Sequence, residues 1–254
     1  MLANNFVEVL PSEFPVWELS ENENKKSEKA YQDIFIEPFT WNKKSNGWGY
    51  LPAAPPGYRA FVKREREKII EFVNPSPDMV GIDVSGGVGN YSIPLSDRVK
   101  VMVHCELEVQ SILRAYTEGK DNMFFVRSPY LKLPFNGESF DLAICTDTLI
   151  RGKKHEVMLL SEIYRILKNG GKAVVDFHNP RFFRRRSRNS ISFYTPEMIK
   201  KILLESRIFR YSIHPFGFVP GRFVPYEYLY LGLDRLFKLF ISPTRYIVVI
   251  NKAY

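Results

Sequence analysis

Four glycines, three of them at 86–89, lie within the stretch GIDVSGGVGN, residues 81–90, which overlaps the apolar run MVGIDV (79–84). Glycine adopts positive φ readily and has no Cβ, so such a turn lets the backbone approach a ligand closely. The stretch contains no lysine, which excludes a phosphate-wrapping P-loop. Ser92 stands where a dinucleotide fingerprint has its third glycine. The stretch therefore indicates a nucleotide-type ligand without choosing among nucleotide cofactors.

A carboxylate follows where a bound ribose would need one. The run VKVMVHCE (99–106) predicts a second buried strand and ends on Glu106, 17 residues after Gly89. In nucleotide-binding α/β units, an acidic residue at this place accepts hydrogen bonds from the ribose hydroxyls. The glycine turn and Glu106 together indicate an adenosine-type ligand.

Apolar runs and amphipathic stretches alternate along the part of the chain that carries these residues. Such alternation predicts a doubly wound, mostly parallel α/β sheet of the Rossmann-like type, with helices on both faces. The last two of seven strands lack a full crossover helix, so we expect an antiparallel C-terminal hairpin. The expected strands are 79–84, 99–106, 123–128, 140–146, 172–178, 208–216 and 244–252. The expected helices are 59–73, 90–98, 107–119, 154–171, 195–206 and 226–240.

Four features in the same order resemble the class I S-adenosylmethionine-dependent methyltransferases, particularly the small-molecule group that includes ubiquinone/menaquinone methyltransferases. They are DVSGGVG (83–89), the acid at the end of the second strand, LPFNGESFDLAIC (133–145) and SEIYRILKNGGKAVV (161–175). The resemblance covers roughly residues 60–214. It implies that the chain is an enzyme that transfers a methyl group from S-adenosylmethionine.

The resemblance also implies which residues bind the cofactor, with two departures from the family's pattern. Ser85 replaces the first glycine of the family's Asp-x-Gly-x-Gly-x-Gly turn. Residues 128–130 lack the acid that accepts a bond from the adenine amino group, so Ser128, a backbone carbonyl or apolar contacts are the alternatives. The implied cofactor-binding residues are Asp83, Ser85, Gly86, Gly87, Gly89, Glu106, Leu107, Ser128, Pro129, Tyr130 and Thr146.

Two polar residues follow the ends of the fourth and fifth strands. In methyl transfer the protein mainly positions the acceptor's lone pair, and a general base helps when the acceptor is protonated. His178, with an ordinary pKa of about 6.5, is the candidate base. Asp147 is the candidate for orienting an acceptor amine or hydroxyl. The alternatives are a histidine that only forms a hydrogen bond within its loop and an aspartate that caps a helix.

Positive charge is concentrated in the second half of the chain. Residues 151–254 hold 20 Lys and Arg against 7 Asp and Glu, a net charge of +13, whereas residues 1–150 carry −5. The run HNPRFFRRRSRNS (178–190) contains five arginines, whose guanidinium groups suit phosphates and carboxylates. Arg181, Arg184 and Arg185 are therefore candidate ligands for a small, glycan-like or lipid-like anionic acceptor.

Other interpretations of this charge stay open. Nucleic acid would be attracted to it, although no Asn/Asp-Pro-Pro-aromatic motif follows the fourth strand. The arginine run together with FGFVPGRFVPYEYLYLGLDRLF (216–237) also suits peripheral contact with a membrane surface. A basic surface exposed only to solvent is a further alternative, and so is a non-catalytic family member that only binds.

Residues 1–58 predict an irregular N-terminal extension, followed by a methyltransferase domain at 59–254 with an insert at 215–244 before the last strand. The segment FTWNKKSNGWGYLPAAPPGY (39–58) is rich in Trp, Gly and Pro. It either folds over the site as an aromatic lid, with Trp48 and Tyr50 contacting the acceptor, or packs on the sheet surface.

The sequence also indicates a compartment. The first residues lack the basic and apolar regions of a signal peptide, and no run approaches the ~18–20 apolar residues that span a bilayer. Cys105 and Cys145 both fall in apolar strand-like segments, which predicts two buried, reduced thiols. We expect a cytoplasmic protein that holds no metal.

Overall fold

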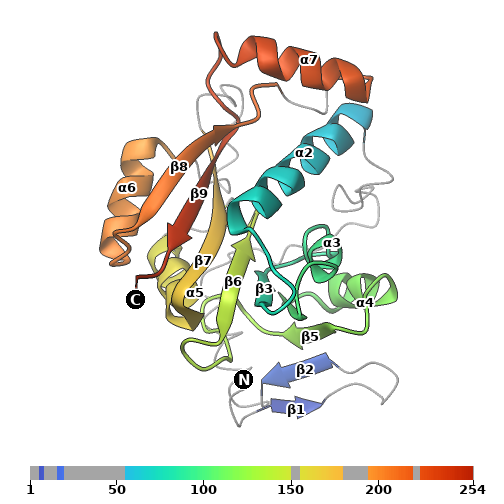
Figure 1. Cartoon of the computed structure of the whole chain (residues 1–254), viewed down its shortest axis with the longest axis vertical. Helices are drawn as coiled ribbons and strands as arrows, with labels where there is room; N and C mark the ends of the chain where they lie inside the picture. Colours follow the sequence, from blue (N-terminus) through green and yellow to red (C-terminus); the bar gives the residue numbers. More distant parts are fainter. Residues whose placement is uncertain are drawn as a thin grey trace.

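A single twisted sheet runs through the computed structural model (Figure 1). The structure describes residues 55–149, 155–179, 194–219 and 224–253, together with the backbone of 6–8 and 16–19. Within this part of the chain the strand order is β1-β2-β5-β4-β3-β6-β7-β9-β8. The strands are β1 (Phe6–Glu8), β2 (Val16–Leu19), β3 (Val80–Val84), β4 (Val101–Glu106), β5 (Met123–Arg127), β6 (Phe140–Cys145), β7 (Leu167–His178), β8 (Tyr211–Phe216) and β9 (Arg245–Asn251).

Strands β3 to β7 are parallel to one another, and β9 is antiparallel to both of its neighbours, β7 and β8. The expected seven-stranded, mostly parallel sheet with an antiparallel C-terminal pair is therefore confirmed. The parallel part of the sheet starts at β3, adds β4 and β5 on one side, and then continues with β6 on the other side. Ligands of open α/β sheets bind outside the carboxyl ends of strands at such a reversal.

Helices cover both faces of this sheet, as expected for a doubly wound fold. One hydrophobic cluster joins α5 and α6 to side chains such as Val84, Cys145 and Phe177. The alternate side chains, among them Ile144 and Ile247, pack with α2, α3 and α4 on the other face. The helices are α2 (Pro56–Val73), α3 (Ser92–Ser96), α4 (Val109–Thr117), α5 (Glu156–Ile166), α6 (Pro196–Glu205) and α7 (Glu227–Phe237).

The sheet extends further than the sequence predicts at its N-terminal edge. β2 pairs in parallel with β5, in the register Val16 to Phe125, and β1 pairs antiparallel with β2. The prediction of an irregular 1–58 is therefore wrong for these two strands. It is also wrong for the start of α2, because that helix begins at Pro56, a residue type with a preset φ that suits the first helical turn.

The expected helix 154–171 ends earlier than its glycines suggest. α5 stops at Ile166, and Leu167 already pairs with Phe140 of β6. Gly170, at φ 78°, donates its N–H to the carbonyl of Lys252. Strand pairing therefore incorporates this segment into β7. Gly170 and Gly171 lie in an irregular stretch of that strand and do not end a helix. At α6 the prediction is confirmed, since the hydroxyl of Thr195 caps the helix.

Two further expectations concern buried thiols and membrane spans. Cys105 and Cys145 are both buried and free, as expected. Among the described helices, none combines the length and the apolar character needed to cross a bilayer.

Candidate active site

A buried aspartate connects the end of β3 to the glycine turn. Asp83 is 1% exposed, and its Oδ2 atom accepts the backbone N–H of Ser92 at 3.1 Å. The Ser92 Oγ atom in turn lies 2.8 Å from Nδ1 of His104 on β4. Burial raises the pKa of Asp83 to about 7, and the hydrogen bonds from Ser92 oppose this rise. Asp83 thus ties the start of α3 to the end of β3.

The turn after β3 holds three residues at positive φ: Ser85 at 58°, Gly87 at 56° and Gly89 at 86°. Ser85 replaces a family glycine but keeps the left-handed conformation that glycine adopts without strain. A Cβ at Gly86 would lie 2.6 Å from the ring of His104, whereas a Cβ at Gly87 would meet no described atom within 4 Å. The turn therefore has open space beside Gly87.

Glu106 links the turn to the end of β4. Its Oε2 atom accepts the N–H of Gly87 at 2.9 Å, and its Oε1 atom accepts the N–H groups of Leu107 at 2.7 Å and Glu108 at 3.1 Å. A carboxylate offers about four lone-pair sites, so one acceptor position remains. Together with the open space at Gly87, this position fits the ribose hydroxyls of an adenosine-type cofactor.

The segment after β5 lacks the family's adenine-binding acid, and its polar groups form hydrogen bonds within the segment. Ser128 is buried, and its hydroxyl lies 3.2 Å from the carbonyl oxygen of Pro129 and 3.4 Å from that of Lys132. Its backbone N–H donates to the carbonyl of Glu106. Tyr130 is also buried. Because the Ser128 hydroxyl is engaged, backbone groups and apolar contacts are the better alternatives for adenine.

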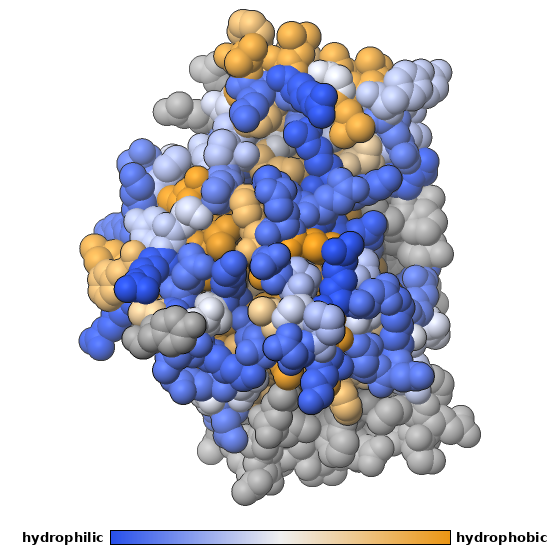
Figure 2. All heavy atoms as spheres, viewed as in Figure 1, coloured by the Kyte–Doolittle hydropathy of each residue, from blue (hydrophilic) through white to orange (hydrophobic). Residues whose placement is uncertain are grey.

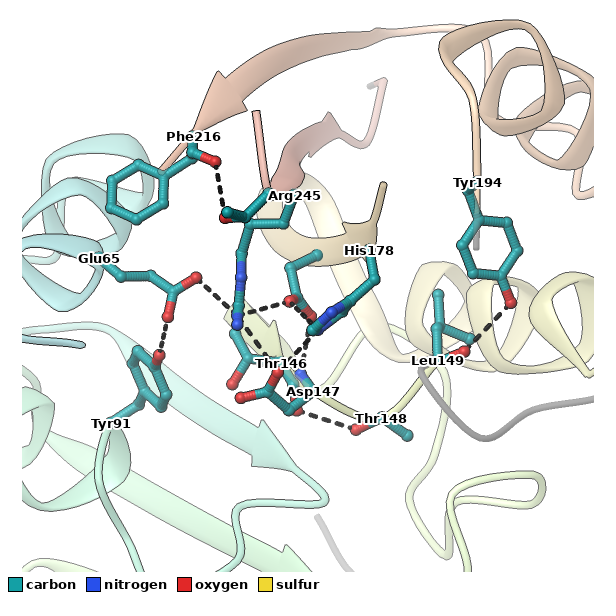
Figure 3. A network of polar contacts seen from close by, with 12 residues as sticks. Glu65, Tyr91, Thr146, Asp147, Thr148, Leu149, His178, Tyr194, Phe216 and Arg245 are labelled. Carbon is teal, nitrogen blue, oxygen red and sulfur yellow. Dashed lines mark hydrogen bonds and ion pairs between the residues drawn. The ribbon is translucent and has the colours of Figure 1, made fainter. Parts of the chain in front are cut away.

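A second polar group lies at the carboxyl ends of β6 and β7 (Figure 3). Nε2 of His178 is 3.0 Å from Oδ1 of Asp147 and 3.6 Å from Oδ2 of Asp176. Asp147 follows the buried Thr146, has φ 55°, and donates its backbone N–H to Asp176 at 2.7 Å. The two predicted catalytic residues are therefore in direct contact. Asp147 does not cap α5, whose N-cap is His155.

Arg245, the first residue of β9, lies at the centre of this group. Its Nη1 atom is 2.8 Å from Glu65 and from Asp176, and 3.2 Å from Asp147. The guanidinium also lies over the ring of Phe61, 4.8 Å from the centroid. Figure 3 shows Glu65 reaching in from α2 on the opposite side to His178. We call Glu65, Asp147, Asp176, His178 and Arg245 the polar cluster.

The electrostatics of the polar cluster follow from this crowding. Burial raises the pKa of Asp176 to about 6 and also raises the pKa of Glu65, although Arg245 opposes both shifts. Desolvation likewise acts against ionisation of Asp147, but Arg245 and His178 outweigh it and hold its pKa below the usual range. The Asp147 side chain is 47% exposed. The Asp147 carboxylate is therefore ionised at neutral pH and is partly exposed to solvent.

Three members of the polar cluster are of types that bind metals. Single ligand atoms of Asp147, Asp176 and His178 lie within 4.8 Å of one another. Arg245 already places a cation 2.8 Å from Asp176, and we therefore regard the guanidinium as the charge that balances these acids.

The residues predicted from the sequence fall into two groups and a remainder. Residues 83–89 contain the turn, Glu106 holds it from the end of β4, and Asp147 and His178 belong to the polar cluster. The remaining acceptor candidates, Arg181, Arg184, Arg185, Trp48 and Tyr50, lie outside the described residues.

Sequence reasoning missed Glu65, Asp176 and Arg245. Signals for two of them were present in the sequence. Glu65 lies midway between Phe61 and Ile69 at helical spacing, on the buried face of α2. Asp176 interrupts the apolar run KAVVDFH of β7. A carboxylate at such a position needs a buried partner, although the sequence does not say which cation supplies it.

A groove among the described residues lies elsewhere. It has a volume of about 540 Å³ and is lined by α2, β8 and α7, with Phe72, His214 and Arg235 among its residues. None of the predicted cofactor or catalytic residues lines it. We therefore place the candidate site by its hydrogen bonds and strand ends rather than by this groove.

Known proteins to which this chain is similar are methyltransferases. Residues 82–175 match the family model described as a methyltransferase domain. The chain is 32% identical over 117 residues to the ubiquinone/menaquinone biosynthesis C-methyltransferase UbiE of Brucella anthropi, which covers 42% of this chain and 44% of the relative. It is 26% identical over 116 residues to demethylmenaquinone methyltransferase of Streptomyces avermitilis, covering 45% and 49%. The matches thus span less than half of these relatives.

Solved structures show the same fold. An S-adenosylmethionine-dependent methyltransferase of Mesorhizobium loti aligns with a TM-score of 0.60 at 15% identity, over 80% of this chain and 100% of that one. Geranyl diphosphate C-methyltransferase of Streptomyces coelicolor, solved with S-adenosyl-L-homocysteine, aligns with a TM-score of 0.58 at 14% identity, over 75% and 76%.

The chain therefore has the fold of the class I S-adenosylmethionine-dependent methyltransferases, and its residues 82–175 match the methyltransferase domain model. Within that class it is similar to the ubiquinone/menaquinone C-methyltransferases. The resemblance and the fold class expected from the sequence are confirmed.

Proposed function

We propose that this protein transfers a methyl group from S-adenosylmethionine to a small-molecule acceptor bound beside the polar cluster. The observation that supports it most is the pairing of Glu106 with Gly87, since it leaves a free acceptor position next to open space. The cofactor supplies an electrophilic methyl group when bound. The residues that would hold it are those of the turn, Glu106 for the ribose and the backbone after β5 for adenine.

The contribution of this chain's own residues lies at the ends of β6 and β7. Nε2 of His178 faces two carboxylates, so the ring carries its proton on Nε2 and its lone pair on Nδ1. Asp147 and Asp176 thereby fix the tautomer and the orientation of the ring. In this proposal Nδ1 takes the proton from an acceptor hydroxyl or amine, and the exposed Asp147 carboxylate orients the acceptor.

The charge of the polar cluster limits how an anionic acceptor would bind. Three carboxylates surround the single guanidinium of Arg245, so the cluster has no positive charge left for an anion. We therefore assign the anionic or polar end of the acceptor to the arginines that follow Asn179 in the sequence, Arg181, Arg184 and Arg185. The reacting end then belongs beside Asp147 and His178.

The relatives supply probes for a test. Purified protein is incubated with S-adenosylmethionine and, separately, with a demethylmenaquinol analogue, geranyl diphosphate and a transfer RNA pool, and methylated products are detected by mass spectrometry. Methylation of one of the small molecules supports the proposal. Methylation of RNA alone would favour nucleic acid as the acceptor. Failure to bind S-adenosylhomocysteine would indicate a non-catalytic member.

The roles of His178 and Asp147 are tested on whichever acceptor is methylated. His178→Gln should lower kcat by about 100-fold with little change in KM for S-adenosylmethionine, because a positioned base contributes on this order. Asp147→Asn should raise KM for the acceptor. His214→Gln, on β8, is the matched control and should leave both constants unchanged. An unaltered kcat in His178→Gln would remove the assigned base.

A further inference from the structure

The outward side of α7 and of the turn that follows it is apolar. The inward side packs on α2, where Tyr230 is fully buried and its ring meets Phe61 edge-on at 6.2 Å between centroids. In Figure 2 orange, hydrophobic side chains gather along the top of the molecule, where α7 lies. The exposed apolar residues here are Tyr226, Tyr228, Leu229, Leu231, Leu236, Leu239, Phe240 and Ile241. We call this set the α7 surface.

The exposure is high enough to require an explanation. Tyr228, Leu239 and Phe240 are 74%, 77% and 76% exposed. Single exposed apolar residues are ordinary on soluble proteins, whereas contiguous patches of this kind mark contact sites. The α7 surface continues past the end of the helix at Phe237 into the turn. It therefore forms one long strip rather than a pocket for a single side chain.

Among the charged side chains of α7 and its C-cap residue Lys238, only the cations remain unpaired within the described residues. Glu227 pairs with Arg59 of α2 at 3.1 Å. Asp234 is buried, pairs with Arg64 at 2.7 Å, and accepts the backbone N–H of Phe218. Both carboxylates of the helix are thus neutralised by α2. Arg235 and Lys238 are exposed and form no ion pair with any described residue.

We propose that the α7 surface docks on an anionic lipid bilayer, with the helix lying in the plane of the interface. An amphipathic helix with apolar side chains and flanking Lys or Arg suits this position, because burial of apolar area and attraction to anionic headgroups act together. Tyr226 and Tyr228, at the start of the helix, are of the type enriched at the headgroup level of membranes. Arg235 and Lys238 also line the nearby groove, together with Glu67 and Glu71 of α2.

A second copy of this chain is a poorer occupant of the same surface. A twofold contact brings identical patches together, so Arg235 and Lys238 of one copy would face the same cations of the other. No acidic side chain of the described α7 surface would offset that repulsion, because Glu227 and Asp234 are already paired. Charge complementarity therefore favours the anionic bilayer.

Docking there would place the bilayer close to the candidate active site. The carbonyl of Pro243, in the connection from α7 to β9, accepts the side-chain amide of Asn179 at 2.8 Å. Two residues after Pro243 the chain reaches Arg245 of the polar cluster. Membrane docking of the α7 surface does not depend on methyl transfer, and vesicle flotation does not measure methyl transfer.

The experiment is vesicle flotation of the full chain. Vesicles of mixed phosphatidylglycerol and phosphatidylcholine should carry the wild type, and vesicles of phosphatidylcholine alone should carry much less. The double substitution Leu239→Ser with Phe240→Ser should weaken binding by about tenfold or more, because both side chains leave the apolar interface. Arg235→Glu with Lys238→Glu should abolish the preference for the anionic vesicles.

The matched control changes two equally exposed apolar residues elsewhere. Leu204 and Phe209, 62% and 71% exposed, lie in and just after α6. Leu204→Ser with Phe209→Ser should float like the wild type. Thermal melting and S-adenosylhomocysteine binding, unchanged in all three double variants, would show that the fold and the cofactor site are intact.

Three results would overturn the proposal. One is a wild type that floats with neither kind of vesicle. Another is an equal loss of binding in the Leu204 and Phe209 control. The third is a dimer, measured by light scattering, that the Leu239 and Phe240 variant dissociates while vesicles bind neither form; that result would assign the α7 surface to self-association.

Discussion

Glu106 and Gly87 are joined by a 2.9 Å hydrogen bond from the glycine N–H to the carboxylate. This bond connects the two sequence features that indicated an adenosine-type ligand, the turn after β3 and the acid at the end of β4. Glu106 therefore holds the turn and has one acceptor position left, which we propose binds the ribose of the cofactor.

Glu106→Gln should raise the dissociation constant of S-adenosylhomocysteine by about tenfold or more. Hydrogen bonds to a charged group contribute about 1.5–3 kcal/mol, and the amide replaces one acceptor oxygen with a donor that opposes an N–H group. Isothermal titration calorimetry measures the change. Glu108→Gln is the control, because Glu108 caps α4 through Gln110 and Ser111 and should affect stability more than affinity. Equal affinity of wild type and Glu106→Gln would remove the ribose assignment.

Two glycine substitutions should have opposite effects on stability. Gly86→Ala places a Cβ 2.6 Å from the His104 ring and 2.9 Å from Asp83, and we expect a loss of about 1–3 kcal/mol from this overpacking. Gly232→Ala in α7 meets no described atom within 4 Å and should add up to about 1 kcal/mol through helix propensity. Urea unfolding measures both, and a stable Gly86→Ala protein would contradict the close packing under the turn.

Arg245→Met should destabilise the fold by about 3–5 kcal/mol, since removing one partner of a buried ionic group leaves uncompensated charge on the others. Glu65 and Asp176 would both lose their 2.8 Å contact. Lys120→Met, which breaks a largely exposed pair with Asp97, should cost about 1 kcal/mol or less. Similar losses in the two variants, measured by urea unfolding, would show that the polar cluster is better solvated than its burial indicates.

The Asp83 carboxyl should make stability fall as the pH rises. Its pKa is raised by burial from the ordinary value of 3.8 to about 7 in the folded chain, so between pH 4 and 7 the folded state holds a proton that the unfolded state has lost. Unfolding free energy then decreases with pH in that window, by up to about 4 kcal/mol from this group. Asp83→Asn removes the effect while keeping an acceptor for the Ser92 N–H. Its unfolding free energy should exceed that of the wild type at pH 7.5 by more than at pH 4.5, and identical pH profiles would contradict the raised pKa.

From α2 onward the sequence was sufficient for the order of strands and helices, because each of these strands is an apolar run next to a turn signal, whereas β1 and β2 were missed. Thr195 with Pro196 predicted the start of α6 because the signal is local. The end of α5 was predicted wrongly for the opposite reason, since Leu167 is taken into β7 by pairing with Phe140, which is distant in sequence.

The candidate site likewise has residues that the sequence predicted and residues that it did not. Gly87 and Glu106 were found because their spacing is a feature of one βαβ unit. The partners of Arg245 come from α2 and β7, 180 and 69 residues away in the chain, and no spacing rule connects them. Ser85 was recognised as a departure from the family, but only its φ of 58° shows that the turn keeps its form.

The position of β9 between β7 and β8 has a consequence for how the chain folds during synthesis. β8 leaves the ribosome before β9, yet among the described strands its only pairing partner is β9. Arg245 arrives with that same strand, so Glu65 and Asp176 lack their cation until it docks. Completion of the sheet and neutralisation of the buried acids therefore happen together, when β9 docks, and a nascent chain that ends before residue 245 should remain open to proteases.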